Sequence, residues 1–224
     1  MPIYNVQLLH INPVETKRYA GLHKAKDFDD KSIINACEDA QLLIEVQGIW
    51  KIYNYDYKNQ IILSEPNVII NGKSIGKHLS NCEKVICIAA TVGEKIENEV
   101  TNRFNAGEYV SSILLDAAAT TAVEQVADAM ENAINQKVSR EGYSMRWRFS
   151  PGYGDWSLDQ QPDLFLLSGA AEIGIKLSSA MMMTPRKSIT AIIGLFKKKI
   201  DDKKNNTRHN CLICNKSDCS SRQI

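Results

Sequence analysis

The chain has 224 residues, 44% of them hydrophobic and 24% charged, which is enough to bury one substantial core. With 27 basic and 26 acidic residues its formal net charge is +1, so bulk electrostatics argue against a nucleic-acid or membrane-surface partner. No segment reaches the roughly 20 apolar residues of a membrane-spanning helix, and residues 1–10 lack the pattern of a signal peptide. We therefore expect a cytoplasmic protein.

The first part of the chain mixes helical and strand patterns. Its predicted elements are a strand at 3–9, a short helix from Asn12 to Tyr19, a helix at 30–47 capped by Asp29 or Asp30 and stopped by Gly48, and strands at 50–57, 60–64 and 67–70. Residues 84–91 form a nearly continuous apolar run, which predicts a central strand covered on both faces, with a helix beginning at Gly93.

Residues 109–140 are rich in Ala, Leu, Glu and Gln and contain no Pro or Gly, so we predict one long helix there. Its small residues Ala117, Ala118 and Ala119 would let a sheet or a ligand approach its axis closely. The remaining predicted elements are a strand at 145–149, a helix at 163–175 and strands at 179–183 and 188–195.

The elements do not alternate as βαβα units, which favours an α+β fold. We predict a mixed, largely antiparallel twisted sheet with the long alanine-rich helix packed on it. This domain would span residues 1–196, and residues 197–224 would form a charged linker and a cysteine-rich tail.

The segment Arg-Phe-Ser-Pro-Gly-Tyr at 148–153 is the most informative part of the sequence. Here a strand ends in a Pro-Gly turn, where Gly152 permits positive φ or close backbone approach. Arg148 could hold the carboxylate of an amino acid through two parallel hydrogen bonds. The alternative is a structural turn in which Arg148 forms a surface ion pair and Tyr153 packs against the sheet.

This segment resembles the R-x-x-x-G-Y signature of the activation domain of cobalamin-dependent methionine synthase, in which the turn binds S-adenosylmethionine. The resemblance extends over residues 80–195 and includes the long helix and the stretches 175–185 and 188–191. It implies an S-adenosylmethionine site made of Glu124, Arg148, Ser150, Gly152 and Tyr153. In this assignment Glu124 holds the amino group of the ligand, and Ser150 acts through its backbone.

Residues 15–22 are similar to the opening of short, stand-alone members related to this domain. The chain departs from the family directly after the tyrosine. The family has a proline there, whereas this chain reads Gly-Asp-Trp at 154–156, so the adenosine side of the site differs. The chain is also too short to hold the folate, homocysteine and cobalamin modules of a complete methionine synthase.

The resemblance implies an accessory module of a methyltransferase system in methionine biosynthesis. The module would dock on a separate cobalamin-binding methionine synthase or other corrinoid protein and present S-adenosylmethionine for its reductive reactivation, with the electron coming from a flavodoxin-like donor. One alternative is a non-catalytic docking or scaffold protein that has lost ligand binding but keeps a metal-binding tail. Another is an independent metal-dependent redox protein.

The six cysteines divide into two groups. Cys37, Cys82 and Cys87 lie scattered in apolar sequence, where single thiols usually act as small buried hydrophobic groups, so we expect no disulfide framework. The second group supplies three or four soft metal ligands within eleven residues: His209, Cys211, Cys214 and Cys219. These ligands suit zinc or an iron–sulfur cluster, and the alternative is a reduced tail without metal.

Overall fold

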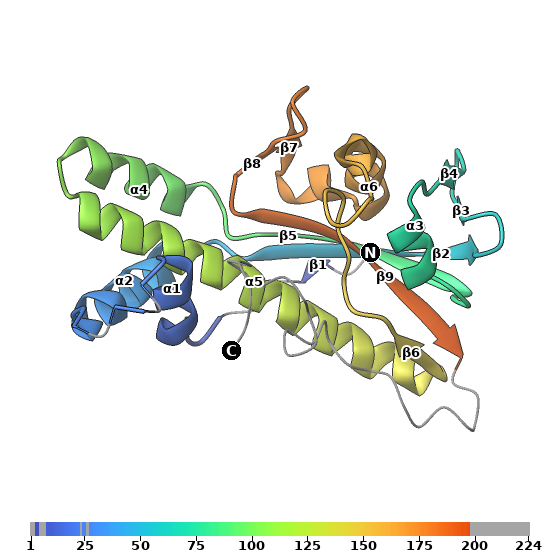
Figure 1. Cartoon of the computed structure of the whole chain (residues 1–224), viewed down its shortest axis with the longest axis horizontal. Helices are drawn as coiled ribbons and strands as arrows, with labels where there is room; N and C mark the ends of the chain where they lie inside the picture. Colours follow the sequence, from blue (N-terminus) through green and yellow to red (C-terminus); the bar gives the residue numbers. More distant parts are fainter. Residues whose placement is uncertain (1–2, 5–7, 23, 26, 198–224) are drawn as a thin grey trace.

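The computed structural model describes residues 3–4, 8–22, 24–25 and 27–197. Its centre is a sheet with the strand order β4-β3-β2-β5-β9-β6, and β1 pairs with β2 (Figure 1). The strands of this sheet are β1 (Ile3–Tyr4), β2 (Gln47–Asp56), β3 (Ile61–Leu63), β4 (Val68–Ile69), β5 (Lys84–Thr91), β6 (Tyr143–Met145) and β9 (Ser188–Lys197). Two short strands, β7 (Lys176–Leu177) and β8 (Met183–Thr184), form a separate hairpin. Every pairing between the described strands is antiparallel.

Strand β5 is covered on both faces, as its apolar run predicts. Its side chains alternate between two clusters of buried residues. Ile86, Ile88 and Ala90 belong to one cluster, and Val85 and Cys87 belong to the other. Each of these residues is 0% exposed, so β5 and its neighbour β9 form the middle of the core.

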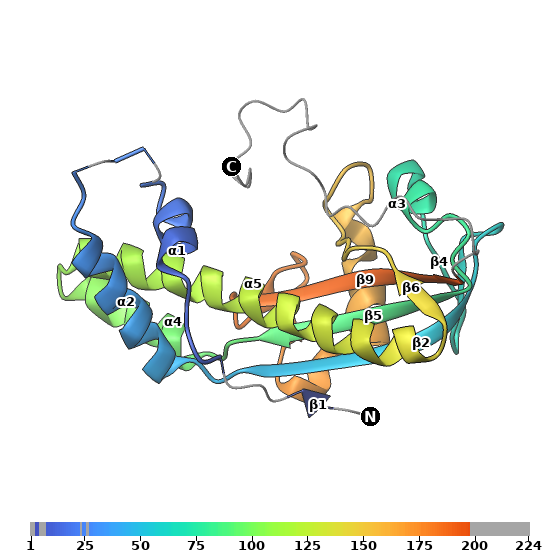
Figure 2. The same ribbon diagram turned by 90° about the horizontal axis from the view of Figure 1, so that it is seen from below.

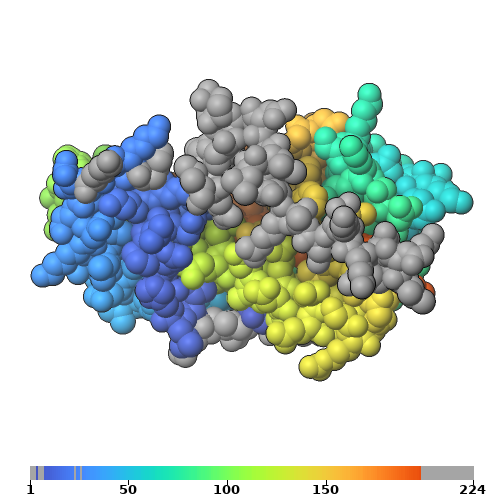
Figure 3. All heavy atoms as spheres, turned by 60° about the horizontal axis from the view of Figure 1, so that its bottom comes forward, coloured from blue at the N-terminus to red at the C-terminus, as the bar shows by residue number. Residues whose placement is uncertain are grey.

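The helices divide between the two faces of the sheet. They are α1 (Pro13–Tyr19), α2 (Asp30–Leu43), α3 (Lys73–His78), α4 (Lys95–Asn105), α5 (Tyr109–Arg140) and α6 (Gln161–Ser168), and 3-10 turns lie at Leu158–Gln160 and Ala170–Ile173. Helix α5 crosses one face of the sheet together with α1 and α2, whereas α6 lies on the other face (Figures 1 and 2). Figure 3 shows the residues of α1 and α2 in blue beside the green-to-yellow residues of α5.

Helix α1 is fixed to the middle of α5. The side chain of Asn12 caps α1 by accepting hydrogen bonds from its first turn, and its backbone N–H donates to Oε1 of Gln125 at 2.9 Å. The hydroxyl of Thr16 lies 3.0 Å from that of Thr121 in the buried contact between the two helices. These contacts hold the start and the middle of α1 against the middle of α5.

Helix α2 begins after the predicted Asp29 cap but ends at Leu43, four residues before its predicted end. Ile44 is extended, and the backbone N–H of Glu45 donates to the carbonyl of Val92 at 2.8 Å. Gly48 does not stop the helix, because it lies inside β2, where a Cβ would come within 2.5 Å of Sδ of Met130. Close packing of the sheet on α5 therefore explains this glycine.

Other predicted boundaries also differ from the structure. The predicted helix at 163–175 ends at Ser168, because Gly169 adopts φ +79, and a 3-10 turn follows. The predicted strands at 145–149 and 179–183 are mostly irregular, although Phe149 forms an isolated bridge with Ile192. Helix α3 was not predicted. Strand β1 lies at the start of the predicted 3–9 strand, of which residues 5–7 lie outside the described residues. Strand β9 continues to Lys197, and residues 198–224 lie outside the described residues.

Candidate functional site

Arg148 lies in an extended segment that runs along β9 after β6. The backbone N–H of Arg146 donates to Gly194 at 2.8 Å, and Phe149 exchanges two hydrogen bonds with Ile192 at 2.8 and 2.9 Å. Adjacent side chains of an extended segment point to opposite faces. Phe149 therefore packs into the core on the α3 side, and Arg148 reaches the face covered by α5.

Three carboxylates of α5 surround the guanidinium group of Arg148. Its Nη2 donates to Oε2 of Glu124 at 2.6 Å, and its Nη1 donates to Oδ1 of Asp128 at 2.6 Å and to Oε2 of Glu131 at 2.8 Å. The backbone N–H of Arg148 also donates to Oε1 of Glu131 at 2.8 Å. We call these four residues the Arg148 cluster.

The helical spacing of the three carboxylates explains how they meet one arginine. Positions 124, 128 and 131 follow one another at intervals of four and three residues, so they lie on one face of α5. Sequence reasoning named Glu124 but missed Asp128 and Glu131. Their spacing was the signal that could have found them.

The Arg148 cluster carries more negative than positive charge. Three carboxylates and one guanidinium leave a formal charge of −2. Burial alone would lower the pKa of Arg148, but the charges of the carboxylates, Glu131 most strongly, outweigh burial and raise it. Arg148 is therefore a permanent cation, and its hydrogen bonds to the carboxylates are charge-assisted.

The guanidinium group retains hydrogen-bonding capacity. Its three side-chain bonds to carboxylates use three of the five N–H groups that an arginine offers. Among the described residues, none accepts a hydrogen bond from Nε or from the second N–H of Nη2. These donors could bind a carboxylate that enters the site.

The turn after Arg148 leaves the sheet in a fixed conformation. The hydroxyl of Ser150 donates to the carbonyl of Thr190 on β9 at 2.7 Å, and Gly152 adopts φ +89, which favours glycine. The backbone N–H of Gly152 donates to the carbonyl of Trp156 at 2.8 Å, which closes the turn. Tyr153 is 65% exposed, so its ring is accessible from solvent and does not pack fully against the sheet.

Two residues after Tyr153 attach the turn to the body of the protein. The carboxylate of Asp155 accepts hydrogen bonds from the backbone N–H groups of Lys73 and Ser74 at 2.9 and 2.8 Å. Trp156 is 1% exposed, and its Nε1 donates to Oε1 of Gln160 at 2.8 Å. The Asp-Trp pair that departs from the family signature is therefore structural here.

The end of α1 forms a wall beside Glu124. Burial raises the pKa of Tyr19, and the charge of Glu124 raises it further. The guanidinium of Arg18 lies 4.1 Å from the centre of the Tyr19 ring and is paired with Glu15 at 2.7 Å. Residues from α1, α5 and the 148–153 turn thus come together, although they are far apart in the sequence.

The three described cysteines behave as buried hydrophobic groups, as predicted. Cys37, Cys82 and Cys87 are free and buried. Burial raises the pKa of Cys82 to about 11, so its thiol stays protonated at neutral pH. The metal ligands predicted at His209, Cys211, Cys214 and Cys219 lie outside the described residues. Within 3–4, 8–22, 24–25 and 27–197, no group of three His, Cys, Asp or Glu side chains could hold a metal ion.

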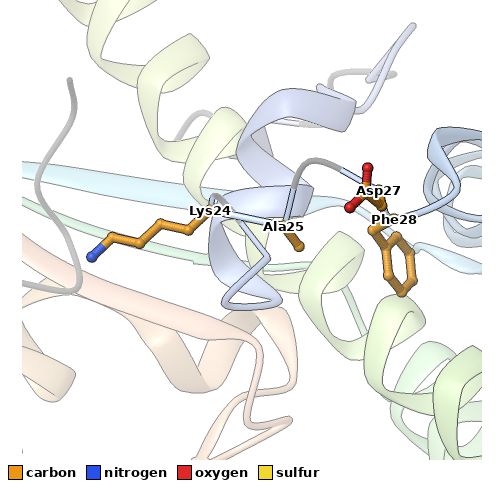
Figure 4. Close-up of a pocket in the computed structure, with 4 residues that line it drawn as sticks. All are labelled: Lys24, Ala25, Asp27 and Phe28. Atoms are coloured by element: carbon orange, nitrogen blue, oxygen red, sulfur yellow. The ribbon is translucent and has the colours of Figure 1, made fainter.

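An open depression lies beside the connection between α1 and α2 and is lined by Lys24, Ala25, Asp27 and Phe28. Figure 4 shows Lys24 pointing away from Asp27 and Phe28, so these side chains do not converge on a common ligand position. The depression shares no residue with the Arg148 cluster or with the 150–153 turn, and we assign it no function.

The described residues define an α+β protein in which one long helix covers an antiparallel sheet and supplies three carboxylates to an arginine. Among solved structures, the chain is similar to the crystal structure of the MetH reactivation domain bound to AdoHcy. The TM-score is 0.56 with 11% sequence identity, over 87% of this chain and 78% of that chain. This likeness establishes a shared fold and confirms the predicted class, with its largely antiparallel sheet and long helix.

No family model matches the chain, and no curated protein sequence matches it. None of the described helices is both long and apolar enough to cross a lipid bilayer.

Proposed function

We propose that this protein binds S-adenosylmethionine beside Arg148 and serves as an accessory module for the reductive reactivation of a cobalamin-dependent methionine synthase or a related corrinoid methyltransferase. The observation that carries the proposal is the Arg148 cluster next to the exposed Tyr153 turn. It occurs in a fold shared with the MetH reactivation domain, which was crystallised with AdoHcy. The R-x-x-x-G-Y pattern supports the same assignment.

The chemistry of S-adenosylmethionine matches the groups at this site. The ligand has a carboxylate, an ammonium group and a positively charged sulfonium. The remaining N–H groups of Arg148 can donate to the carboxylate, while the carboxylates of Glu124 and Glu131 favour the two cationic groups. Backbone groups around Ser150 and Gly152, and the ring of Tyr153, are available for the rest of the ligand.

The contribution of this chain would be positioning. Cobalamin belongs to the partner in this proposal, and its cobalt would accept the methyl group after an electron has arrived from a flavodoxin-like donor. The residues of this chain would bind the amino-acid end of S-adenosylmethionine and orient its sulfonium methyl group toward the partner. No covalent bond to a residue of this chain is required.

One observation favours the alternative of a docking protein without ligand. Glu124 does not stand free for an ammonium group, because it already bonds Arg148 at 2.6 Å. An incoming carboxylate must therefore use the other N–H groups of Arg148 or displace Glu124. If neither occurs, the cluster only ties the 148–153 turn to α5.

The proposal is tested by titration calorimetry with S-adenosylmethionine on the wild type and on Arg148→Lys. Lysine keeps the positive charge next to the carboxylates but loses the planar set of donors. We expect the wild type to bind and Arg148→Lys to bind at least about tenfold more weakly, which corresponds to about 1.4 kcal/mol.

Arg103→Lys is the matched control. Arg103 is also paired with two carboxylates, those of Asp39 and Glu99, each at 2.9 Å, but it lies on α4. Arg103→Lys should leave the affinity for S-adenosylmethionine unchanged. Thermal unfolding of Arg148→Lys and Arg103→Lys checks that both variants fold. An absence of binding heat from the wild type at millimolar ligand would reject the proposal in favour of the docking alternative.

A further inference from the structure

Helix α3 touches both ends of the segment that carries the proposed ligand residues. The segment runs from Trp147 to Asp155 and includes Arg148, Ser150, Gly152 and Tyr153. Helix α3 spans Lys73–His78 and is about 9 Å long, because each residue adds about 1.5 Å. One end of this short helix bonds Asp155, and the other end bonds Trp147.

At its first turn, α3 is capped by a residue distant in the sequence. Its own N-cap position is Gly72, which has no side chain to accept hydrogen bonds. Asp155 fills that role with bonds of 2.8 and 2.9 Å to Ser74 and Lys73. Gly154 packs against the same turn, since a Cβ at this position would lie 3.1 Å from Oγ of Ser74.

At its last residue, α3 contacts the backbone immediately before Arg148. Nε2 of His78 lies 2.8 Å from the carbonyl of Trp147, so this nitrogen is the donor. The ring centre of His78 lies 4.5 Å from that of Trp147 and 5.2 Å from that of Phe149. His78 is only 8% exposed, so its position is fixed by packing.

The helix itself is firmly held in the core. Ile75 and Leu79, on its buried side, are both 0% exposed and belong to the cluster that includes Trp156. A rigid support for a binding loop is effective only when it is anchored elsewhere. Helix α3 meets this requirement.

We propose that α3 is a brace for the ligand site, that His78 and Asp155 are positioning residues that hold Arg148 and Tyr153 in their binding geometry, and that His78 makes ligand affinity fall in acid. This inference rests on the proposed function and extends it to the regulation of the same site. Neither residue needs to touch the ligand.

The dependence on pH follows from the surroundings of His78. Burial lowers the pKa of His78 below its ordinary value of 6.5, the hydrogen bond to the carbonyl of Trp147 partly offsets this effect, and the charge of Arg146 lowers the pKa further. Neutral His78 donates through Nε2 alone, whereas protonation would place a second cation beside Arg146 in the packed ring cluster. The state in which α3 holds the segment 147–155 therefore disfavours protonation of His78. Acid, which protonates His78, shifts the equilibrium away from this state.

The first test compares the affinity for S-adenosylmethionine of the wild type and His78→Gln at about pH 8 and about pH 5.5. Glutamine keeps an N–H donor near the position of Nε2 but does not titrate. We expect affinities within about twofold at the higher pH. At the lower pH, the wild type should lose at least about fivefold more affinity than His78→Gln. Equal pH profiles would overturn the role of His78.

The second test uses Asp155→Ala, with Asp155→Asn as the rescue. Alanine removes the cap of α3, and asparagine is a good capping residue without charge. We expect Asp155→Ala to bind S-adenosylmethionine about tenfold more weakly, and Asp155→Asn to recover most of the loss. Rescue by a neutral residue would show that the cap, and not the charge, sets the affinity.

Asp29→Ala is the control for general loss of stability. Asp29 caps α2 through bonds of 3.1 Å to Lys31 and Ser32, away from the segment 147–155. Asp29→Ala should lower the unfolding temperature about as much as Asp155→Ala does, without changing the affinity for S-adenosylmethionine. Equal affinities of Asp155→Ala and Asp29→Ala, with binding by the wild type intact, would reject the brace and leave the proposed function standing. Absence of binding by the wild type would reject both.

Discussion

Arg148 and Lys187 show how two cations on the same helix surface can have different consequences. Lys187 pairs with one carboxylate, that of Asp116, at 2.9 Å, so its charge is balanced one to one. Arg148 faces three carboxylates, those of Glu124, Asp128 and Glu131, at 2.6 to 2.8 Å. We therefore expect the Arg148 cluster to select ligands by charge, whereas the Lys187 pair joins the residue before β9 to α5.

We predict that the carboxylates of the Arg148 cluster favour S-adenosylmethionine over S-adenosylhomocysteine, which lacks the sulfonium charge. A unit charge about 6 Å from a carboxylate gains roughly 3 kcal/mol at an effective dielectric of 20. Since Asp128 is 39% exposed, solvent screening reduces this to about 1 kcal/mol, or about fivefold in affinity. Asp128→Asn should therefore reduce the preference for S-adenosylmethionine about fivefold in competition titrations.

Asp116→Asn is the matched control for this prediction. Asp116 lies twelve residues earlier on α5, which places it about 18 Å away and beyond the Debye length at physiological salt. The preference should not change in this variant. A preference that is the same in the wild type and in Asp128→Asn would show that the sulfonium does not sense the cluster.

At the scale of elements, local sequence patterns predict β5 and α5 well and α3 not at all. The apolar run of β5 and the summed helix propensity of α5 are properties of contiguous residues, so both bounds agree with the structure. Helix α3 is six residues long, contains Gly76 and takes its cap from Asp155. No local pattern can report a cap that comes from more than eighty residues away.

The candidate site also combines residues that local sequence predicts with residues that only tertiary packing brings together. Arg148 and Gly152 could be singled out because they belong to one short segment, and the structure brings Glu124 to Arg148. The direct bond between the two was not expected, nor were the contributions of Asp128 and Glu131. Which residues of α5 face the 148–153 turn depends on how the helix crosses the sheet, and this is a property of tertiary packing.

Helix α1 offers a test of a local cap, that of Asn12. Oδ1 of Asn12 accepts hydrogen bonds from the backbone of Val14 at 2.9 Å and of Glu15 at 3.3 Å. We predict that Asn12→Ala lowers the free energy of unfolding by about 1 kcal/mol, and that Asn12→Asp preserves it. Urea denaturation measures the change. The exposed Asn102 of α4 provides the comparison, because its replacement by alanine should cost nothing.

At the scale of the whole molecule, the prediction that the domain ends at residue 196 can be tested by truncation. The sheet runs from β4 to β6, and both of its faces are covered by helices within residues 3–4, 8–22, 24–25 and 27–197. We predict that a chain ending at Lys197 unfolds within about 2 °C of the full chain and binds S-adenosylmethionine equally well. Differential scanning calorimetry and titration measure both quantities.

The same pair of chains tests the predicted metal site. Metal analysis after anaerobic purification should find zinc or iron in the full chain and none in the chain ending at Lys197. Replacing Cys211, Cys214 and Cys219 with serine should have the same effect as the truncation. A full chain without metal would contradict the prediction, and a large drop in unfolding temperature after truncation would contradict the domain boundary.

The lengths of the outer strands determine how this protein meets its neighbours in a crowded solution. The sheet is bounded by β4 and β1, with two residues each, and by β6, with three. A long exposed edge is a template on which another chain can add a strand and begin to aggregate. These short edges give an incoming strand few backbone groups to pair with. Each of these outer strands is therefore a poor template for an added strand, and we expect edge-to-edge association through them to be weak.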